Sequence, residues 1–210
     1  MTKLIYGHDT LCGWCFGFIP TLEHFARTHP GVEIDVLPGG LVTGDRIQPY
    51  ASMASYITNA EVNLSKVTGR SLGKKFHEMM NAEDTPMSDS SPPGHAVLQM
   101  KELASERVVE FAHALQEVHF TEGKDLNKAE TYDELCSKQG FPALDTDKIV
   151  RATERDPMVA KSFARAVRLG IRSFPTILIV NDQDEIISTM ATIYDPDAFV
   201  RAFQEMTSGQ

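Results

Sequence analysis

The chain has few cysteines and a deficit of positive charge. Three cysteines in 210 residues are too few for a secreted scaffold held together by disulfide bonds. Lysine and arginine number 20 against 29 aspartate and glutamate residues, so the net charge is −9. An acidic chain is a poor partner for nucleic acid or for an anionic membrane surface, and we expect neither.

Long hydrophobic runs are also missing. No apolar stretch approaches the roughly 20 residues that a membrane-spanning helix needs. The N-terminus shows no basic segment followed by an apolar one, which is the pattern of a secretory signal. We therefore expect a cytoplasmic protein. In that reducing environment a pair of nearby cysteines is more often catalytic or metal-binding than structural.

Two of the three cysteines form the motif Cys12-Gly13-Trp14-Cys15. A strand-like run precedes it at residues 3–6, and residues 16–26 follow with apolar side chains at helical spacing. Cys12 is therefore expected at the start of a helix, where free N–H groups and the helix dipole stabilise a thiolate. We predict that Cys12 attacks a disulfide and that Cys15 resolves the resulting mixed disulfide.

The first half of the chain predicts a short α/β segment followed by helices. Residues 3–37 give strand, helix and strand, with Pro20 compatible with the first turn of the helix. No convincing strand appears from about residue 44 to 156. Residues 92–123 carry an apolar stripe at helical spacing with a break near Ser105, and residues 82–93 have the composition of a surface loop.

The second half returns to an α/β pattern. Thr131 fits a capping box that opens a helix, and Asp145 or Thr146 is expected to cap a further short one. Asp156 is expected to cap a longer helix, two strands follow, and Asp195 caps the last helix. The element order is thus β-α-β, a helical insertion, and α-β-β-α.

In this order the chain resembles the DsbA-like branch of the thioredoxin superfamily. The CxxC motif lies at a helix start, and Phe174-Pro175-Thr176 opens the third strand. Residues 11–17 and 115–125 are similar to a bacterial DsbA-family group of predicted protein-disulfide isomerases. The resemblance implies an α/β thioredoxin fold with a large all-helical insertion domain. Residues 1–43 plus 157–210 would form the discontinuous thioredoxin-like domain, and residues 44–156 the inserted helical domain.

The resemblance also implies roles for residues around the motif. Pro175 would be a cis-proline facing the two cysteines, and Phe174 would touch bound substrate. Trp14 is expected to lie exposed and to contact an apolar substrate segment with its indole face. His8 could assist proton transfer at Cys12, although an ordinary polar residue at a strand end explains it equally well.

A zinc site is the main alternative for the cysteine pair. A structural zinc ion needs four ligands; His8 lies near the pair in sequence, and Cys136 is free to join in principle. No second CxxC motif and no His-x-x-x-His pair exists. We therefore expect no metal and no cofactor beyond the redox-active pair, with glutathione as a candidate reductant. Cys136 is expected to be an unpaired structural thiol.

These observations favour a thiol–disulfide oxidoreductase or protein-disulfide isomerase acting on protein or small-molecule disulfides and thiols. Because no histidine stands between the cysteines, the site should be less oxidising than sites that have one. A glutathione-dependent transferase or isomerase of the kappa or hydroxychromene-carboxylate isomerase type is the alternative, although that type activates the thiol of glutathione with one serine or cysteine. A non-enzymatic peptide-binding module around Trp14 and Phe174 is a further one.

Overall fold

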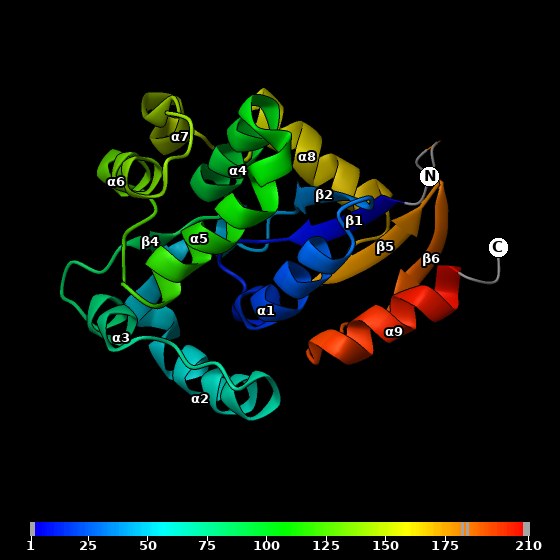
Figure 1. The fold of residues 1–210 in the computed structure, drawn as a ribbon. Helices are drawn as coiled ribbons and strands as arrows, with labels where there is room; N and C mark the ends of the chain where they lie inside the picture. Colours follow the sequence, from blue (N-terminus) through cyan, green and yellow to red (C-terminus); the bar gives the residue numbers. More distant parts are fainter. Residues whose placement is uncertain (1–2, 182, 184, 208–210) are drawn as a thin grey trace.

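The computed structural model of the chain describes residues 3–181, 183 and 185–207 (Figure 1). A four-stranded sheet lies beside a group of helices. The described helices are α1 (Gly13–Thr28), α2 (Tyr50–Thr68), α3 (Lys74–Met80), α4 (Ser91–Leu103), α5 (Val108–Phe120), α6 (Ala129–Gln139), α7 (Thr146–Arg151), α8 (Pro157–Arg168) and α9 (Pro196–Thr207). Two short 3₁₀ turns, η1 (Gly44–Arg46) and η2 (Ser105–Arg107), accompany them. None of the described helices is long and apolar enough to cross a membrane.

The sheet has the strand order β2-β1-β5-β6. Its strands are β1 (Lys3–His8), β2 (Glu33–Pro38), β5 (Thr176–Val180) and β6 (Ile186–Met190). β1 pairs parallel with β2, which places α1 in the crossover between them. β5 runs antiparallel to both β1 and β6. The arrangement is the β-α-β and α-β-β-α order expected from the sequence, so the thioredoxin-like fold is confirmed.

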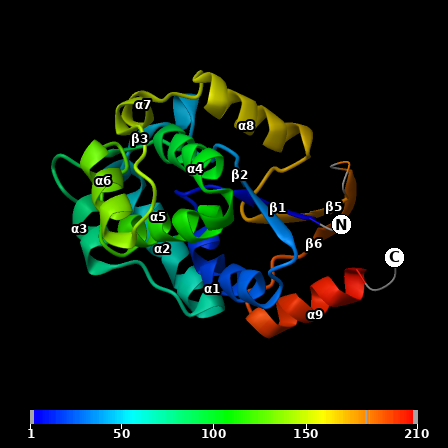
Figure 2. The same cartoon turned by 45° about the horizontal axis from the view of Figure 1, so that its top comes forward.

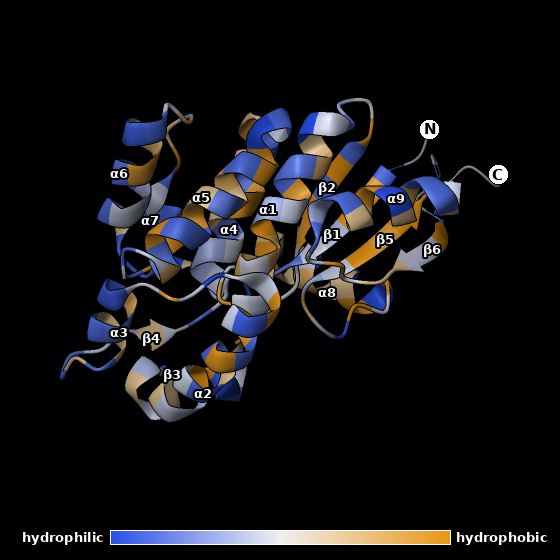
Figure 3. Ribbon diagram, turned by 60° about the horizontal axis from the view of Figure 1, so that its bottom comes forward, coloured by the Kyte–Doolittle hydropathy of each residue, from blue (hydrophilic) through white to orange (hydrophobic). Residues whose placement is uncertain are grey.

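Helices cover both faces of this sheet. Figure 2 shows α8 on one side and α1 with α9 on the other. On the α1 side, Phe25 stacks edge-on against Phe199 with their ring centroids 5.5 Å apart. On the α8 side, Ala166 packs with Ile5 and Leu178. In Figure 3, which is coloured by hydropathy, β5 is largely hydrophobic, whereas α6, far from the sheet, is largely hydrophilic. This cover buries most of β1, β2 and β5, whereas β6 at the edge of the sheet stays largely exposed.

The helical insertion follows the predicted pattern with two differences. The break near Ser105 is confirmed, because η2 separates α4 from α5. The expectation of no strand between residues 44 and 156 is wrong, because β3 (Gln48–Pro49) and β4 (Met87–Ser88) form a small antiparallel ladder. The surface-loop interpretation of residues 82–93 fails at its C-terminal end, where residues 90–93 are buried as α4 begins.

Two helix starts also differ from the prediction. Pro20 lies well inside α1, past the first turn, because the helix begins at Gly13. Thr131 does not open a capping box. The Thr131 hydroxyl donates to the carbonyl of Asp125 at 2.7 Å, and α6 begins earlier, at Ala129. The capping-box pattern did not predict that the Thr131 hydroxyl would bond to the carbonyl of Asp125, six residues earlier. The caps at Asp145, Asp156 and Asp195 are confirmed by side-chain bonds to backbone N–H groups.

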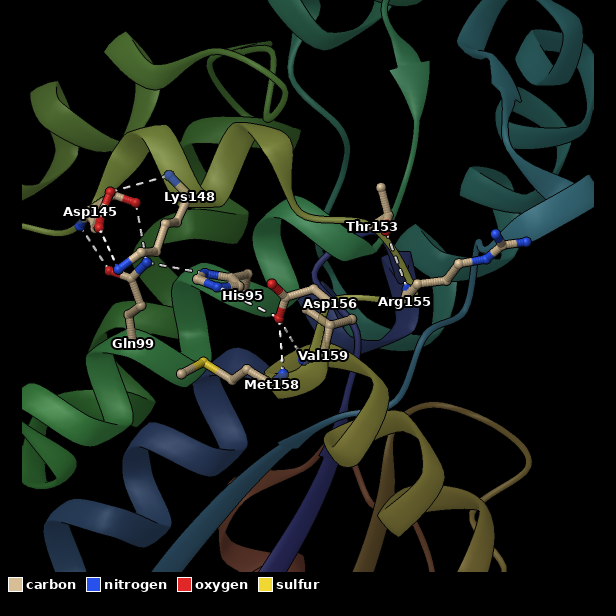
Figure 4. Close-up of polar contacts among 9 residues, drawn as sticks. All are labelled: His95, Gln99, Asp145, Lys148, Thr153, Arg155, Asp156, Met158 and Val159. Atoms are coloured by element: carbon tan, nitrogen blue, oxygen red, sulfur yellow. Dashed lines mark hydrogen bonds and ion pairs between the residues drawn. The ribbon is translucent and has the colours of Figure 1, made fainter.

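A polar junction joins α4, α7 and α8 (Figure 4). Gln99 Oε1 accepts from the N–H of Asp145, and Gln99 Nε2 lies 3.1 Å from His95 Nδ1. The opposite ring nitrogen of His95 lies 3.8 Å from the Asp156 carboxylate. Asp156 caps α8 through the N–H groups of Met158 and Val159. The insertion is thereby attached where the chain re-enters the sheet domain.

A buried charge cluster makes a second attachment. Asp35 on β2 is buried, yet it forms ion pairs with Lys101 of α4 and with Arg165 of α8, the latter at 2.7 Å. These cations lower the pKa of Asp35 against the effect of burial. A buried carboxylate is tolerated when it is paired in this way. The division into residues 1–43 plus 157–210 and residues 44–156 stays a prediction, and one hydrophobic cluster contains side chains from both parts.

Acid should destabilise the fold through buried neutral histidines. His119 is fully enclosed, accepts from the Tyr50 hydroxyl at 2.9 Å and donates to the Lys124 carbonyl at 3.0 Å. Burial lowers the pKa of His119 to about 4. Between pH 6.5 and about 4 the unfolded chain takes up a proton at this residue and the folded chain does not. The stability from His119 is therefore full above pH 6.5 and is lost as the pH falls, by about 1.4 kcal/mol per pH unit.

Urea unfolding of the wild type and of His119→Gln between pH 4 and 7 measures this. A glutamine amide can keep both hydrogen bonds but does not titrate. The free energy of unfolding of the variant should fall less steeply with acid, and equal slopes would contradict the assignment.

Candidate active site

Cys12 caps the N-terminus of α1, as predicted. The chain leaves β1, makes a short loop over residues 9–11 and enters the helix at Gly13. Cys12 Sγ accepts from the N–H of Cys15 at 3.4 Å and donates to the carbonyl of Phe174 at 3.3 Å. The thiol thus lies among the free N–H groups of the helix start, which favour a negative charge.

Cys15 lies one turn further along α1 and is fully buried. Burial, and then the neighbouring Cys12 thiol, raise the pKa of Cys15 well above its ordinary value. Cys12 is only 5% exposed, but its side chain lines a cavity beside the start of α1. Cys15 does not line this cavity. The two sulfurs therefore differ in access, as attacking and resolving thiols should.

Phe174 faces Cys12 from the other half of the chain, and the buried Pro175 follows it; that Pro175 faces the cysteines stays a prediction. Their peptide bond is cis, and β5 starts directly after it at Thr176. Phe174 is half-buried, lines the same cavity as Cys12 and offers its carbonyl to the Cys12 thiol. The structure therefore brings together the CxxC motif and Phe174, which lie 162 positions apart in the sequence.

Trp14 is less exposed than the sequence suggested. The indole is half-buried, packs on the hydrophobic core and lies 5.8 Å, between ring centroids, from Tyr194. One part of Trp14 still lines the cavity. The prediction of a free indole missed this packing because Tyr194 is distant in the sequence. A contact with substrate stays a prediction.

His8 ends β1 and is fully buried. Burial is the main cause that lowers the pKa of His8 to about 3, so the imidazole is neutral at physiological pH. One ring nitrogen lies 3.5 Å from the Thr10 hydroxyl, and the other has no hydrogen-bond partner. The structure places His8 behind the motif, and its role in proton transfer stays a prediction.

Two residues that sequence reasoning missed hold the loop before Cys12. The buried Asp9 carboxylate accepts from the N–H groups of Leu11 and Leu41 and from the Ser90 hydroxyl. Gln116 on α5 donates through Nε2 to the carbonyls of Asp9, Thr10 and Cys12 at 3.2–3.3 Å. Apart from the Asp9–Leu11 contact, these hydrogen bonds join segments distant in the sequence, so no local pattern predicted them.

A cavity of about 670 Å³ opens beside Cys12. One wall is the face of α2 that carries Met53, Ile57, Ala60 and Leu64 at helical spacing. Other apolar side chains come from the body of the protein, and charged groups lie among them at Asp45, Arg46, Glu61 and Arg172. A cavity of this size and mixed lining is typical of a small-molecule or peptide site.

The remaining cysteine stands apart from the site. Cys136 on α6 is a free, buried thiol whose pKa burial raises to about 11. Within residues 3–181, 183 and 185–207, no group of three or more histidine, cysteine or acidic side chains is placed to hold a metal ion. The described residues thus offer two thiols and a cavity for chemistry.

A thiol pair at a helix start, with a cis-proline directly before an antiparallel strand of the same sheet, defines a dithiol protein of the thioredoxin fold. The comparison with protein families agrees, because residues 7–204 match the DSBA-like thioredoxin domain. The chain belongs to this family. The comparison with curated proteins gave no match.

Solved structures give the same picture. The chain is 25% identical to the cytosolic disulfide reductase DsbM from Pseudomonas aeruginosa, with a TM-score of 0.79 over 99% of this chain and 98% of that one. DsbM has also been solved with glutathione (25% identity, TM-score 0.77, 99% and 100% covered). The fold is shared with a candidate protein disulfide isomerase from Nitrosomonas europaea, at 20% identity and a TM-score of 0.78 over 100% of this chain and 98% of that one. It is also shared with a 2-hydroxychromene-2-carboxylate isomerase, at 13% identity and a TM-score of 0.63 over 99% of each chain.

The three thiols should react in a fixed order. Cys12 lines the cavity, whereas Cys15 and Cys136 do not, and burial raises the pKa of both of these thiols. Iodoacetamide at pH 8 should therefore modify one thiol per folded reduced chain, and peptide mass mapping should place it at Cys12. All three should react in denaturant. Early labelling of Cys136 would contradict this order.

Proposed function

We propose that the protein is a thiol–disulfide oxidoreductase that reduces or isomerises disulfides in the cytosol. The observation that carries the proposal is the Cys12 thiol, which lines a cavity at a helix start, opposite Phe174 and in front of the buried Cys15. The family match and the similarity to a cytosolic disulfide reductase support it.

The reaction runs in two displacements. The Cys12 thiolate attacks one sulfur of the substrate disulfide, and the other sulfur leaves as a thiolate that takes up a proton. Cys15 then loses its proton and attacks Cys12 Sγ, which forms the Cys12–Cys15 disulfide and releases the second substrate thiolate. Two electrons pass from the dithiol to the substrate. A cellular thiol must then reduce the protein again. If instead a different thiolate of the same substrate attacks the substrate sulfur bound to Cys12, Cys12 leaves as a thiolate and the net result is isomerisation.

Glutathione is the thiol that we propose for this exchange. It is a small peptide with two carboxylates and an amino group, so it suits a cavity that carries both cations and anions. Arg46 and Arg172 are the cations among the lining residues, and Asp45 and Glu61 are the anions. DsbM, which shares the fold over the whole chain, has been solved with the same tripeptide.

A second function would use the same cavity with a single thiol. In a glutathione-dependent transferase or isomerase the protein activates the thiol of glutathione, and Cys15 would have no chemical part. Cys15 lies directly behind Cys12 and within reach of its electrostatic influence, which favours the dithiol reaction. A peptide-binding module without redox activity would need neither thiol.

Insulin reduction by dithiothreitol or glutathione tests the dithiol reaction. The wild type should accelerate precipitation of the insulin B chain. The rate catalysed by Cys12→Ser should be lower by about 100-fold or more, because this variant lacks the nucleophile. Cys15→Ala should instead accumulate a Cys12 mixed disulfide that mass spectrometry detects.

Three outcomes separate the candidates. Equal inertness of wild type and Cys12→Ser would reject the oxidoreductase. Full turnover of a glutathione-dependent substrate by Cys15→Ala would favour the transferase. Holdase activity that survives removal of both cysteines, with no redox activity in the wild type, would favour the binding module.

The charge of Arg172 should matter for glutathione affinity. Arg172 is exposed at the cavity, so loss of its contact with a carboxylate should raise the Kd by about three- to tenfold in Arg172→Ala. Arg155→Ala is the matched control, because Arg155 is exposed but is not among the residues that line the cavity. Titration calorimetry of the reduced Cys15→Ala protein with glutathione measures both. Equal affinities would place the tripeptide elsewhere.

A further inference from the structure

The cavity beside Cys12 has an apolar wall that glutathione does not explain. On α2, the side chains of Met53, Ile57, Ala60 and Leu64 follow one another at steps of three or four residues, and all of them line the cavity. From Met53 to Leu64 this stripe runs for about 16 Å along the helix. Glutathione carries two carboxylates, an amino group and no large apolar side chain, so it leaves this wall without a partner.

The C-terminal end of this apolar wall packs against the start of α1. A Cβ placed on Gly13, the residue after Cys12, would lie 3.6 Å from Leu64 Cδ2. A Cβ placed on Gly17, one turn further along α1, would lie 2.7 Å from Thr68 Cγ2, so glycine at this position lets α2 approach α1 closely. The wall therefore begins within one residue of the thiol that would react with a substrate.

The one charged side chain that α2 contributes to the lining already has partners within the protein. Glu61 Oε1 accepts from the N–H of Leu72 at 2.7 Å, and Glu61 Oε2 lies 2.9 Å from His77 Nε2. Other charged groups of the lining, such as Asp45 on η1 and Arg172 between α8 and β5, come from different segments. The cavity thus divides by element into a charged part and an apolar part.

Aromatic rings complete the apolar part. Tyr50, Phe76 and Phe120 line the cavity and belong to one buried hydrophobic cluster. The rings of Phe76 and Phe120 lie 5.2 Å apart between centroids, and those of Tyr50 and Phe76 lie 5.8 Å apart. Tyr56 also lines the cavity and is 75% exposed, so the apolar surface continues to solvent. Exposed apolar surface that continues into a cavity is typical of a ligand-binding groove.

We propose that the apolar part binds one half of an asymmetric disulfide, in which glutathione is joined to a small apolar thiol. The inference rests on the proposed oxidoreductase function and names its substrate class. The Cys12 thiolate attacks one sulfur, the S–S bond breaks, and the other half leaves with the electron pair and takes a proton from solvent. Cys15 then loses its proton to solvent and displaces the first half. The dithiol is thereby oxidised, and the substrate is reduced to two thiols.

The recessed position of the thiol favours a small substrate. Cys12 is 5% exposed and lines a cavity of about 670 Å³, which is within the range of cavities that enclose small molecules. Each methylene that leaves water for the apolar wall makes binding more favourable. An alkyl group of increasing length should therefore bind more tightly, step by step, until the wall is covered.

Kinetics with a homologous series of substrates test the subsite. The series consists of the mixed disulfides of glutathione with methanethiol, propanethiol and hexanethiol. Glutathione serves as the reductant, and chromatography follows release of the alkyl thiol. After subtraction of the uncatalysed rate, kcat/KM of the wild type should rise by about two- to fourfold for each added methylene.

Substitutions on α2 locate the subsite. Ile57→Ser places a hydroxyl in the apolar wall, so the ratio of kcat/KM for the hexyl substrate to that for the methyl substrate should fall by about fivefold or more. Met53→Gln, which keeps the length of the side chain, should lower the same ratio. Val62→Ser is the matched control, because Val62 is 68% exposed on the same helix and is not among the residues that line the cavity. It should keep the wild-type ratio. A ratio of two substrates does not depend on the fraction of folded protein.

The outcomes separate the subsite from the function on which it rests. If the wild type reduces neither insulin nor any member of the series, the proposed function fails. If it reduces the whole series with one kcat/KM, the oxidoreductase stands and the apolar subsite is overturned. A ratio that falls as much in Val62→Ser as in Ile57→Ser would show that the alkyl group does not bind on the α2 wall, and would overturn the assignment as well.

Discussion

The register between β1 and β5 is the constraint on which the site depends. Gly7 pairs with Thr176, so the end of β1 lies beside the start of β5. Cys12 follows the end of β1, and Phe174 precedes the start of β5. The Cys12 thiol therefore lies 3.3 Å from the Phe174 carbonyl oxygen, although the two residues are 162 positions apart in the sequence. A slip of one residue would turn every side chain of β5 to the opposite face and remove Phe174 from the thiol. The buried apolar residues of both strands prevent that slip.

Features that depend on neighbours in the sequence could be predicted, and those that depend on distant contacts could not. Cys12 at a helix start, the break near Ser105 and the cap at Asp156 follow from local rules, and all three are present. Gln116 could not be recognised because its amide bonds to a loop more than 100 positions earlier. Trp14 was misplaced for the same reason, since its exposure is set by Tyr194.

The insertion serves the active site as well as the fold. Gln116 and Ser90 both come from the insertion, and both bind the segment that leads to Cys12. The cysteine pair is therefore fixed from two sides, by the sheet through Phe174 and by the helices through Gln116. In the reaction that we propose, fixed donors and acceptors around the Cys12 sulfur would reduce the reorganisation that each displacement requires.

The cavity wall formed by α2 differs from the rest of the site in how much the fold relies on it. Of its 19 residues only Tyr50 and Leu64 are buried, while Met53, Ala54 and Ile57 are half-buried at the edge of a core cluster that contains no strand residue. Substitutions at Met53, Ile57 or Ala60 would reshape the cavity while leaving the sheet, the cysteines and their supports intact. Descendants of this chain could therefore acquire new substrates by drift along a single helix, with the chemistry inherited unchanged.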